Sequence, residues 1–268
     1  MSRRTVPRTI SRVGGRWLGE AVRRGWDVAA KYGAIHPGSG RRAERFGRLG
    51  AGSLIAFPSA DLFGERWMDI GEEVLVSPHA TLTVGYGPEQ VEGLGPGPHL
   101  VIGDRSVVNV GCVILAHTSI TLGDDVWLGR NVFITDTDHG YTDLDTPIGR
   151  QMGPCRPVSI GSGSWLGHGA VVLSGSTIGR HVVVAAGSVV TGDVPDRCVV
   201  AGAPARVVKR HVEGDTWERV TAEMAAADRL AARSTNGATA PNGATAPNGS
   251  AAPNGSGTNG SAATKEPA

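Results

Sequence analysis

The sequence predicts an all-β chain built around a left-handed parallel β-helix, with flanking N- and C-terminal helices and a disordered tail. Three observations predict this fold. Aliphatic residues return every six positions in several runs between residues 70 and 190, glycine accounts for 40 of 268 residues, and aromatic residues make up only 5%. A conventional globular core usually contains more aromatic rings, whereas a stack of small repeated turns does not need them.

The six-residue period is the strongest pattern in the sequence. An amphipathic helix would show a period of about 3.6 residues instead, and glycine at this density would destabilise it. Six residues make one short strand and a corner, so three units close a triangular coil of about 18 residues with the aliphatic side chains inside. The fifteen periodic positions are Ile70, Val76, Leu82, Ile102, Val108, Ile114, Leu122, Leu128, Ile134, Ile160, Leu166, Val172, Ile178, Val184 and Val190.

Glycine often follows the periodic aliphatic residue, as at Gly123 and Gly161. We expect these glycines to supply backbone angles that other residues rarely adopt at a corner. Each coil buries little apolar surface by itself, so stability must come from stacking on neighbouring coils.

Interruptions of the period indicate the domain boundaries. The β-helix is expected over residues 51–211, with long loops at 83–101 and 135–158. A long insertion in a regular solenoid is more often functional than accidental. Residues 234–268 repeat Asn-Gly-Ala-Thr-Ala-Pro and its variants without aliphatic residues, so we predict that they are disordered.

Both flanks of the β-helix are expected to hold helices. Residues 1–50 carry twelve Arg or Lys and three Asp or Glu, a local charge of +9, and residues 10–31 have the pattern of a basic amphipathic helix. We expect this helix to dock on the β-helix or cap its first coil; the alternative is contact with an anionic membrane surface. Residues 212–233 are predicted to form a C-terminal helix from about Thr216, with Asp215 as its N-cap.

Charge and cysteine content narrow the function and the compartment. The formal net charge of +1 gives no general attraction to nucleic acid. The three cysteines form no Cys-x-x-Cys pair, so neither a disulfide framework nor a zinc knuckle is indicated, and a reducing cytoplasm fits best. No apolar run approaches the roughly 20 residues of a membrane span. We expect a cytoplasmic protein, and membrane contact through the basic N-terminus would place it at the inner face.

The segment from Leu122 to Lys209 resembles the hexapeptide-repeat acyltransferase family, and most of all its sugar O-acetyltransferase branch. Hexapeptide repeats alone indicate a fold, but a histidine-bearing loop and a Gly-x-Pro-Ala-Arg ending are typical of the acyltransferases. The stretches that carry the resemblance are residues 109–115 (Asn-Val-Gly-Cys-Val-Ile-Leu), residues 121–134 with the following loop that contains His139, and residues 159–206.

The resemblance implies transfer of an acetyl or other acyl group from acyl-CoA to a hydroxyl of a sugar or polysaccharide, without a metal. It also implies a homotrimer with one active site at each subunit interface, and His139 as the catalytic base. The implied acceptor residues are Asn109, Asp138 and Trp165. The implied acyl-CoA residues are His168, Ala186, Thr191, Arg206 and Lys209.

The residue types agree with this chemistry. A sugar hydroxyl is a poor nucleophile, so its proton must leave as it attacks the thioester, and imidazole, with an ordinary pKa of about 6.5, suits that task. Asp136 or Asp138 is a candidate to orient the ring of His139, and no covalent enzyme intermediate is needed. Two positions depart from the family pattern: Gly111 replaces a second asparagine, and Gly192 replaces a lysine.

Simpler interpretations stay open for several residues. His117 and His168 are also explained as exposed corner residues, Trp127 and Trp165 as packing residues, and Arg206 as a surface charge. A γ-class carbonic anhydrase would need a histidine where Leu173 stands, and leucine cannot ligate zinc. The remaining alternatives are an amino-sugar N-acyltransferase, an antibiotic acetyltransferase of the same fold, and a non-catalytic scaffold.

Overall fold

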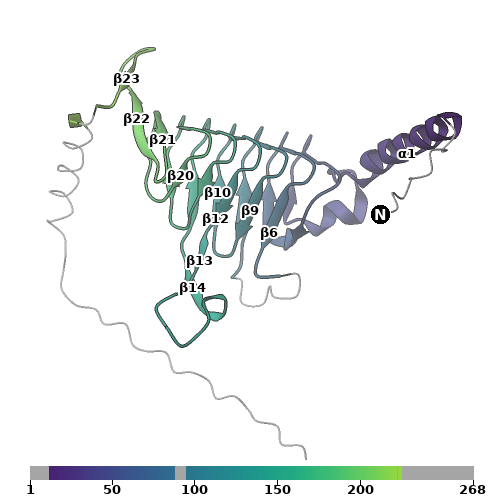
Figure 1. Cartoon of the computed structure of the whole chain (residues 1–268), viewed down its shortest axis with the longest axis horizontal. Coiled ribbons are helices and arrows are strands. Elements are labelled where there is room, and N and C mark those ends of the chain that lie inside the picture. The colour runs from purple at the N-terminus through teal and green to yellow at the C-terminus, as the bar shows by residue number, and fades with distance from the viewer. Residues whose placement is uncertain (1–11, 88–94, 222, 225–268) are drawn as a thin grey trace, which may run out of the picture. The chain divides into compact units, whose positions relative to one another are not determined.

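The structure is a computed structural model that describes residues 12–87, 95–221 and 223–224. Residues up to Ala225 form one unit, and within it the chain winds through a stack of three-sided coils (Figure 1). The second unit, Ala226–Ala268, contains the predicted disordered tail and lies outside the described residues.

The first side of the stack is a six-stranded parallel sheet, hereafter the first sheet. Its order, β1-β4-β7-β10-β15-β18, skips two strands at most steps because the chain visits the other two sides before it returns. Its strands are β1 (Arg48–Leu49), β4 (Met68–Ile70), β7 (Leu100–Ile102), β10 (Ile120–Leu122), β15 (Val158–Ile160) and β18 (Thr177–Ile178).

The second sheet begins in the same parallel manner and ends with two antiparallel strands, in the order β2-β5-β8-β11-β16-β19-β21-β22-β23. Its strands are β2 (Leu54–Ile55), β5 (Leu75–Val76), β8 (Val107–Val108), β11 (Trp127–Leu128), β16 (Trp165–Leu166), β19 (Val183–Val184), β21 (Cys198–Ala201), β22 (Arg206–His211) and β23 (Trp217–Arg219).

The third sheet closes the triangle, and a separate hairpin of β13 (Thr137–His139) and β14 (Met152–Cys155) leaves the stack beside it. We call the turns from the first to the second sheet the first corner, those from the second to the third sheet the second corner, and those from the third back to the first sheet the third corner. The third sheet contains β3 (Leu62–Phe63), β6 (Thr81–Val84), β9 (Val113–Ala116), β12 (Phe133–Thr135), β17 (Val171–Val172) and β20 (Val189–Val190).

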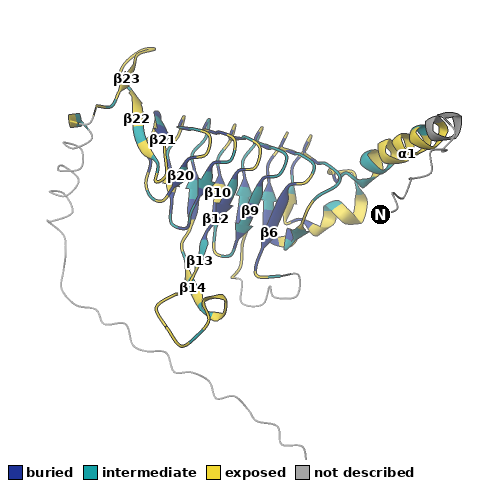
Figure 2. Ribbon diagram, viewed as in Figure 1, coloured by how far each residue is buried: buried dark blue, intermediate teal, exposed yellow. Residues whose placement is uncertain are grey.

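The periodic aliphatic residues stack in register along the inside of the coils. In the first sheet Leu122 pairs with Ile102 on one side and with Ile160 on the other, and the same holds in the other two sheets. All fifteen side chains are at most 2% exposed, and Figure 2 shows dark blue segments along the strands of the stack. The predicted parallel β-helix is therefore confirmed.

The glycines that follow these aliphatic residues serve close packing, so our expectation of unusual backbone angles was wrong. The glycines with positive φ are others, such as Gly163, with φ of 72°, two residues beyond Gly161. A Cβ atom on Gly161 would lie 2.6 Å from the carbonyl carbon of Gly179 and 2.7 Å from the backbone nitrogen of Arg180. The next coil passes so near that only hydrogen fits.

This difference predicts unequal effects of two glycine substitutions. We expect Gly161→Ala to lower the free energy of unfolding by about 1–3 kcal/mol, because its methyl group meets backbone atoms that cannot rotate away. Gly169 has φ of 66° and open space around its Cβ position, and asparagine tolerates such angles. Gly169→Asn should therefore change stability by less than about 1 kcal/mol. Urea unfolding of both variants checks the prediction, and equal losses would contradict it.

The two predicted insertions differ in structure. The first runs from Gly85 to His99 between β6 and β7, with residues 88–94 outside the described part. The second is largely ordered as the antiparallel β13–β14 hairpin, in which Thr137 pairs with Cys155 and His139 with Met152. A 3-10 helix, Ile148–Arg150, precedes β14.

The helix predicted over 212–233 is wrong in its first part. β22 turns back along β21, and β23 then pairs with β22, so that Trp217 lies opposite His211 with ring centroids 5.6 Å apart. The last parallel strand leaves backbone N–H and C=O groups unpaired at its edge, and these groups favour an extended partner over an isolated helix. Residues 225–233 lie outside the described residues.

The N-terminal helix is present as α1 (Arg12–Gly33), close to the predicted span. Its C-terminal end meets the β-helix, where the ring of Trp26 lies 6.1 Å from that of Phe57 and Arg42 donates a 2.7 Å hydrogen bond to the carbonyl of Gly33. From residue 17 to residue 28, however, every residue is exposed or half-buried. Within the described residues no helix is both long and apolar enough to cross a membrane. Two further 3-10 helices, Gly40–Arg45 and Glu65–Trp67, complete the N-terminal part.

Candidate active site

The predicted base, His139, ends β13 at the third corner, where the hairpin projects from the stack (Figure 1). Its side chain is exposed, and its Nδ1 atom lies 3.4 Å from the carbonyl oxygen of Gln151. A carbonyl oxygen can only accept, so this hydrogen bond requires the proton on Nδ1 and leaves the lone pair of Nε2 free. That tautomer is the one a general base at Nε2 needs.

The side chain of Gln151, whose carbonyl contacts His139, is hydrogen-bonded to the backbone of the hairpin turn. Its amide nitrogen donates to the carbonyls of Asp143 and Thr146, both at 2.7 Å, and its amide oxygen accepts from the N–H of Asp143 at 3.2 Å. These bonds close the turn between the two hairpin strands. The Gln151 carbonyl that faces His139 is therefore fixed by its own side chain.

Neither candidate aspartate orients the ring of His139. The carboxylate of Asp138 pairs with Arg156 at 3.2 Å, next to the hairpin. The carboxylate of Asp136 is fully buried and faces the coil below, where its contacts are with residues 117–119. The expectation that one of them would orient the imidazole of His139 was wrong, because the carbonyl of Gln151 contacts its Nδ1 instead.

Asp136 binds the third corner of the preceding coil. It accepts hydrogen bonds from the backbone N–H groups of His117, Thr118 and Ser119 at 2.8, 2.6 and 2.7 Å, and the Nδ1 atom of His117 lies 3.4 Å from it. Burial alone would raise the pKa of Asp136, but the hydrogen bonds from His117 and from these backbone groups outweigh it and lower the pKa below its ordinary value.

His117 thus has a largely enclosed side chain, only 9% exposed, and is not the exposed corner residue of the simpler interpretation. Its ring lies 4.2 Å from that of Tyr86, in the first insertion. The hydroxyl of Tyr86 is 3.4 Å from the sulfur of Cys155, and this hydrogen bond raises the pKa of Tyr86. The Cys155 thiol in turn donates to Thr137 at 3.3 Å. The two insertions therefore meet beside the hairpin.

Sequence reasoning missed this cluster, although one signal was present. The six-residue count takes a step of eight between Ile114 and Leu122, so the corner at 117–119 has two extra residues. Their additional N–H groups need acceptors when the next coil covers them. A buried aspartate one coil later, at Asp136, is the corresponding acceptor.

The other predicted residues occupy three places. Asn109, His168 and Ala186 lie at the second corner. Thr191 lies at the third corner, as does the hairpin with Asp138 and His139. Trp165, Arg206 and Lys209 lie on the second sheet, Trp165 directly beside Trp127 in the register and both with more than half of their surface exposed.

The structure therefore brings some predicted residues together and keeps others apart. Asn109 at the second corner and His117 at the third lie at opposite ends of strand β9, which by itself spans about 10 Å at 3.3 Å per residue. Within one chain, the second-corner residues and His139 face opposite edges of the third sheet. A single chain does not assemble all of them into one pocket.

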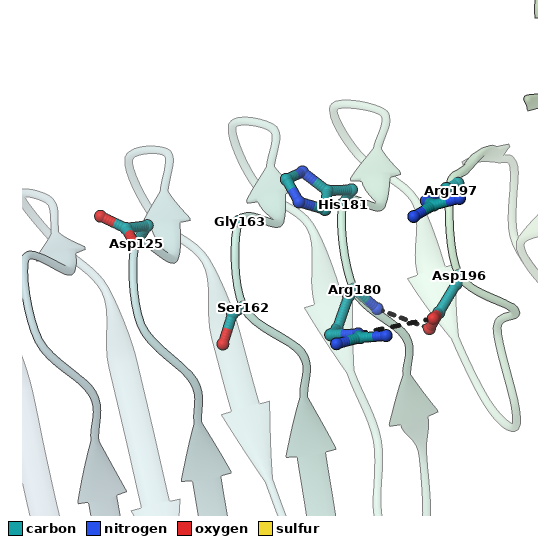
Figure 3. A pocket seen from close by; sticks show the side chains of 7 residues that line it. All are labelled: Asp125, Ser162, Gly163, Arg180, His181, Asp196 and Arg197. Carbon is teal, nitrogen blue, oxygen red and sulfur yellow. Dashed lines mark hydrogen bonds and ion pairs between the residues drawn. The ribbon is translucent and has the colours of Figure 1, made fainter. Parts of the chain in front are cut away.

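A separate hollow of about 450 Å³ lies at the first corner (Figure 3). Its lining includes Asp125, Gly163 and His181 from successive coils, and the guanidinium of Arg180 pairs with Asp196 at 3.6 Å. None of the predicted site residues line it, so it is distinct from the His139 hairpin. Among the described residues, no three His, Cys, Asp or Glu side chains are grouped to hold a metal ion.

Two protein-family models match parts of the chain. The bacterial transferase hexapeptide (six repeats) matches residues 157–192, and the hexapeptide repeat of succinyl-transferase matches residues 99–136. Both ranges lie in the stacked coils and together cover the turns on either side of the hairpin.

Relatives and a solved structure agree with these matches. A Dictyostelium discoideum protein named as a putative acetyltransferase is 32% identical over 157 residues, 59% of this chain and 75% of that protein. The polysialic acid O-acetyltransferase of Escherichia coli is 35% identical over 135 residues, 50% of this chain and 43% of that enzyme. The chain spans only 49–63% of the length of three further relatives. A variant of AntD, an N-acyltransferase from Bacillus cereus, shares the fold with a TM-score of 0.51 at 14% identity, over 75% of this chain and all of that one.

Proposed function

Because this chain belongs to the hexapeptide-repeat acyltransferase family, whose fold is the left-handed parallel β-helix, we propose that it transfers an acetyl group from acetyl-CoA to a hydroxyl of a sugar or polysaccharide. The observation that carries the proposal is the imidazole of His139, exposed on the hairpin with Nδ1 bonded to a carbonyl and Nε2 free. A relative that O-acetylates polysialic acid supports a saccharide acceptor.

In the proposed reaction, Nε2 of His139 removes the proton of the acceptor hydroxyl while its oxygen attacks the thioester carbonyl. A backbone N–H at a coil corner stabilises the oxyanion of the tetrahedral intermediate. The C–S bond then breaks, the ester forms, and the imidazolium returns its proton to the departing CoA thiolate. General-base assistance of this kind typically contributes about 10²–10⁴ in rate.

The cysteines support a direct transfer without an acyl-enzyme. Cys112 and Cys198 are buried inside the coils, and burial raises the pKa of Cys112 and raises that of Cys198 to about 11. Because the thiolate is the nucleophile, such thiols are inert near neutral pH. The thiol of Cys155 is engaged with Thr137 and Tyr86.

The placement of the remaining residues supports a site shared between copies of the chain. A neighbouring copy whose second corner packs against the third corner of the first would bring its Asn109, His168 and Ala186 to the His139 hairpin. The exposed side chain of Trp165 would then face the acceptor. Arg206 and Lys209, both exposed on β22, would meet CoA phosphates. A homotrimer satisfies these requirements by closed symmetry.

Incubation with acetyl-CoA and matched panels of neutral saccharides and amino sugars tests the proposal. Release of CoA thiol is followed together with the mass of the product. We expect thiol release that depends on a neutral saccharide, with an ester product that mild alkali removes. Acetylation of amino sugars alone would instead establish an N-acyltransferase. Failure of the chain to bind acetyl-CoA by calorimetry would leave only the scaffold interpretation.

A further inference from the structure

Helix α1 has two chemically distinct halves that the proposed reaction does not use. At 3.6 residues per turn, its charged residues from Glu20 to Lys31 fall on one half of the helix and its large apolar residues on the other. The charged half contains Glu20, Arg23, Arg24, Asp27 and Lys31. The apolar half contains Trp17, Leu18, Val22, Trp26, Val28 and Tyr32.

The apolar half is open to solvent. Its six large side chains are between 55% and 75% exposed, and Figure 2 shows α1 mostly in yellow. Trp26 keeps 55% of its surface exposed even though its ring contacts Phe57. A contiguous apolar surface of this kind marks an interaction site, because single exposed apolar residues would be scattered instead.

The charge of the region selects the class of partner. Helix α1 contains five basic and two acidic residues, and residues 1–50 together carry +9 against −8 for the rest of the chain. One acidic residue, Glu20, is bonded by both Arg23 and Arg24, at 2.7 and 3.1 Å. A partner that covers the apolar half therefore meets dense positive charge beside it. A partner with negative charge would bind this region more favourably.

We propose that α1 lies in the surface of an anionic lipid bilayer. Its apolar half would enter the region between the head groups and the acyl chains, and Arg23, Arg24 and Lys31 would contact the anionic head groups. Trp17 and Trp26 are nine residues apart, about two and a half turns, so they lie at opposite borders of the apolar half. Indole rings prefer this interfacial depth.

A second copy of the chain is a poorer occupant of the same surface. It would bring another +9 segment against the first, and like charges at an interface are unfavourable. The membrane proposal is also independent of the proposed reaction. The hairpin with His139 contains none of the residues of α1, so a soluble saccharide should be acetylated equally well with or without lipid.

Vesicle flotation of the full chain tests the proposal. Vesicles of phosphatidylcholine with about 40% phosphatidylglycerol should bind the protein at least tenfold more tightly than pure phosphatidylcholine. Roughly 0.5 M salt should weaken this binding. Leu18→Asp with Val22→Asp should reduce binding to the anionic vesicles at least tenfold. Leu144→Asp, at a leucine that is 94% exposed outside α1, is the matched control and should bind like the parent chain.

Circular dichroism and the unfolding midpoint establish that the double variant retains the β-helix. Arg23→Glu with Arg24→Glu should also abolish the preference for anionic vesicles. Equal binding of the double aspartate variant and the control would overturn the proposal. The proposal would also be overturned if the parent chain did not bind vesicles and the double aspartate variant had a lower oligomeric mass in solution than the parent. The apolar half of α1 would then be a contact surface between two copies of the chain.

Discussion

His139→Ala should lower kcat/KM for acetyl transfer by about 10²–10⁴-fold, because the acceptor hydroxyl then loses the only positioned base that the proposed reaction gives it. The loss should appear in kcat, since the imidazole acts on a proton that moves only in the transition state. Steady-state kinetics at a fixed pH near neutrality provide the measurement.

His181→Ala is the matched control for this experiment. His181 is an exposed histidine at the first corner, in the hollow of Figure 3 and away from the hairpin. It should retain the parent rate, and both variants should keep the parent's oligomeric mass. Unchanged turnover in His139→Ala would remove this residue from the mechanism. It would direct attention to His117, another histidine at the third corner, whose side chain is 9% exposed.

Asp136→Asn should lower the free energy of unfolding by about 2–5 kcal/mol, because it leaves three backbone N–H groups without the buried charged acceptor that they share. The carboxylate accepts from three backbone donors at the corner of the coil below, and its own side chain is 0% exposed. An asparagine of the same shape has one acceptor oxygen, and its amide group points two further donors at the same N–H groups. Asp138→Asn, whose partner Arg156 is exposed, should cost less than about 1 kcal/mol.

The contribution of Asp136 depends on pH in a defined direction. Its pKa is lower in the folded chain than in the unfolded chain, so its stabilisation is fully present above the ordinary aspartate value of about 3.9. It is lost as the pH falls through the lower folded pKa. Urea unfolding at decreasing pH should therefore show a steeper acid loss in the parent than in Asp136→Asn. Parallel curves would show that this carboxylate does not carry the effect.

The sequence was sufficient for the fold because one rule repeats. Every periodic position from Ile70 to Val190 needs only an aliphatic side chain, and neighbour stacking turns that local requirement into a coil. The position of the His139 insertion followed from the same count. The hairpin inside it did not, since its closure depends on the hydrogen bonds of one side chain, Gln151, that carries no periodic signal.

The contacts within the candidate site were harder to predict from the sequence than the fold, for a physical reason. Asp136 and Asp138 are two residues apart and chemically identical, yet one points into the stack and the other toward Arg156. Which of them is buried depends on the coil beneath, about 20 residues earlier in the chain. The prediction of a C-terminal helix failed for the same reason. The free edge of β21 exists only in the finished sheet, and pairing with that edge outweighs the local helix signal of Asp215.

The even stacking of the coils fixes the distance between residues on different coils of the second sheet. Strands in a sheet are about 4.8 Å apart, so the three steps from β16 to β22 hold Trp165 and Arg206 about 14 Å apart along the stack. In the proposed function, the acceptor at Trp165 and the CoA phosphates at Arg206 would be separated along the stack by that length. Deleting or inserting one whole coil between the two residues would preserve the cross-section and the inner ladders, yet it would shift one residue by about 5 Å relative to the other. The spacing between the proposed acceptor and CoA contacts would thus depend on the number of coils, separately from the chemistry at His139.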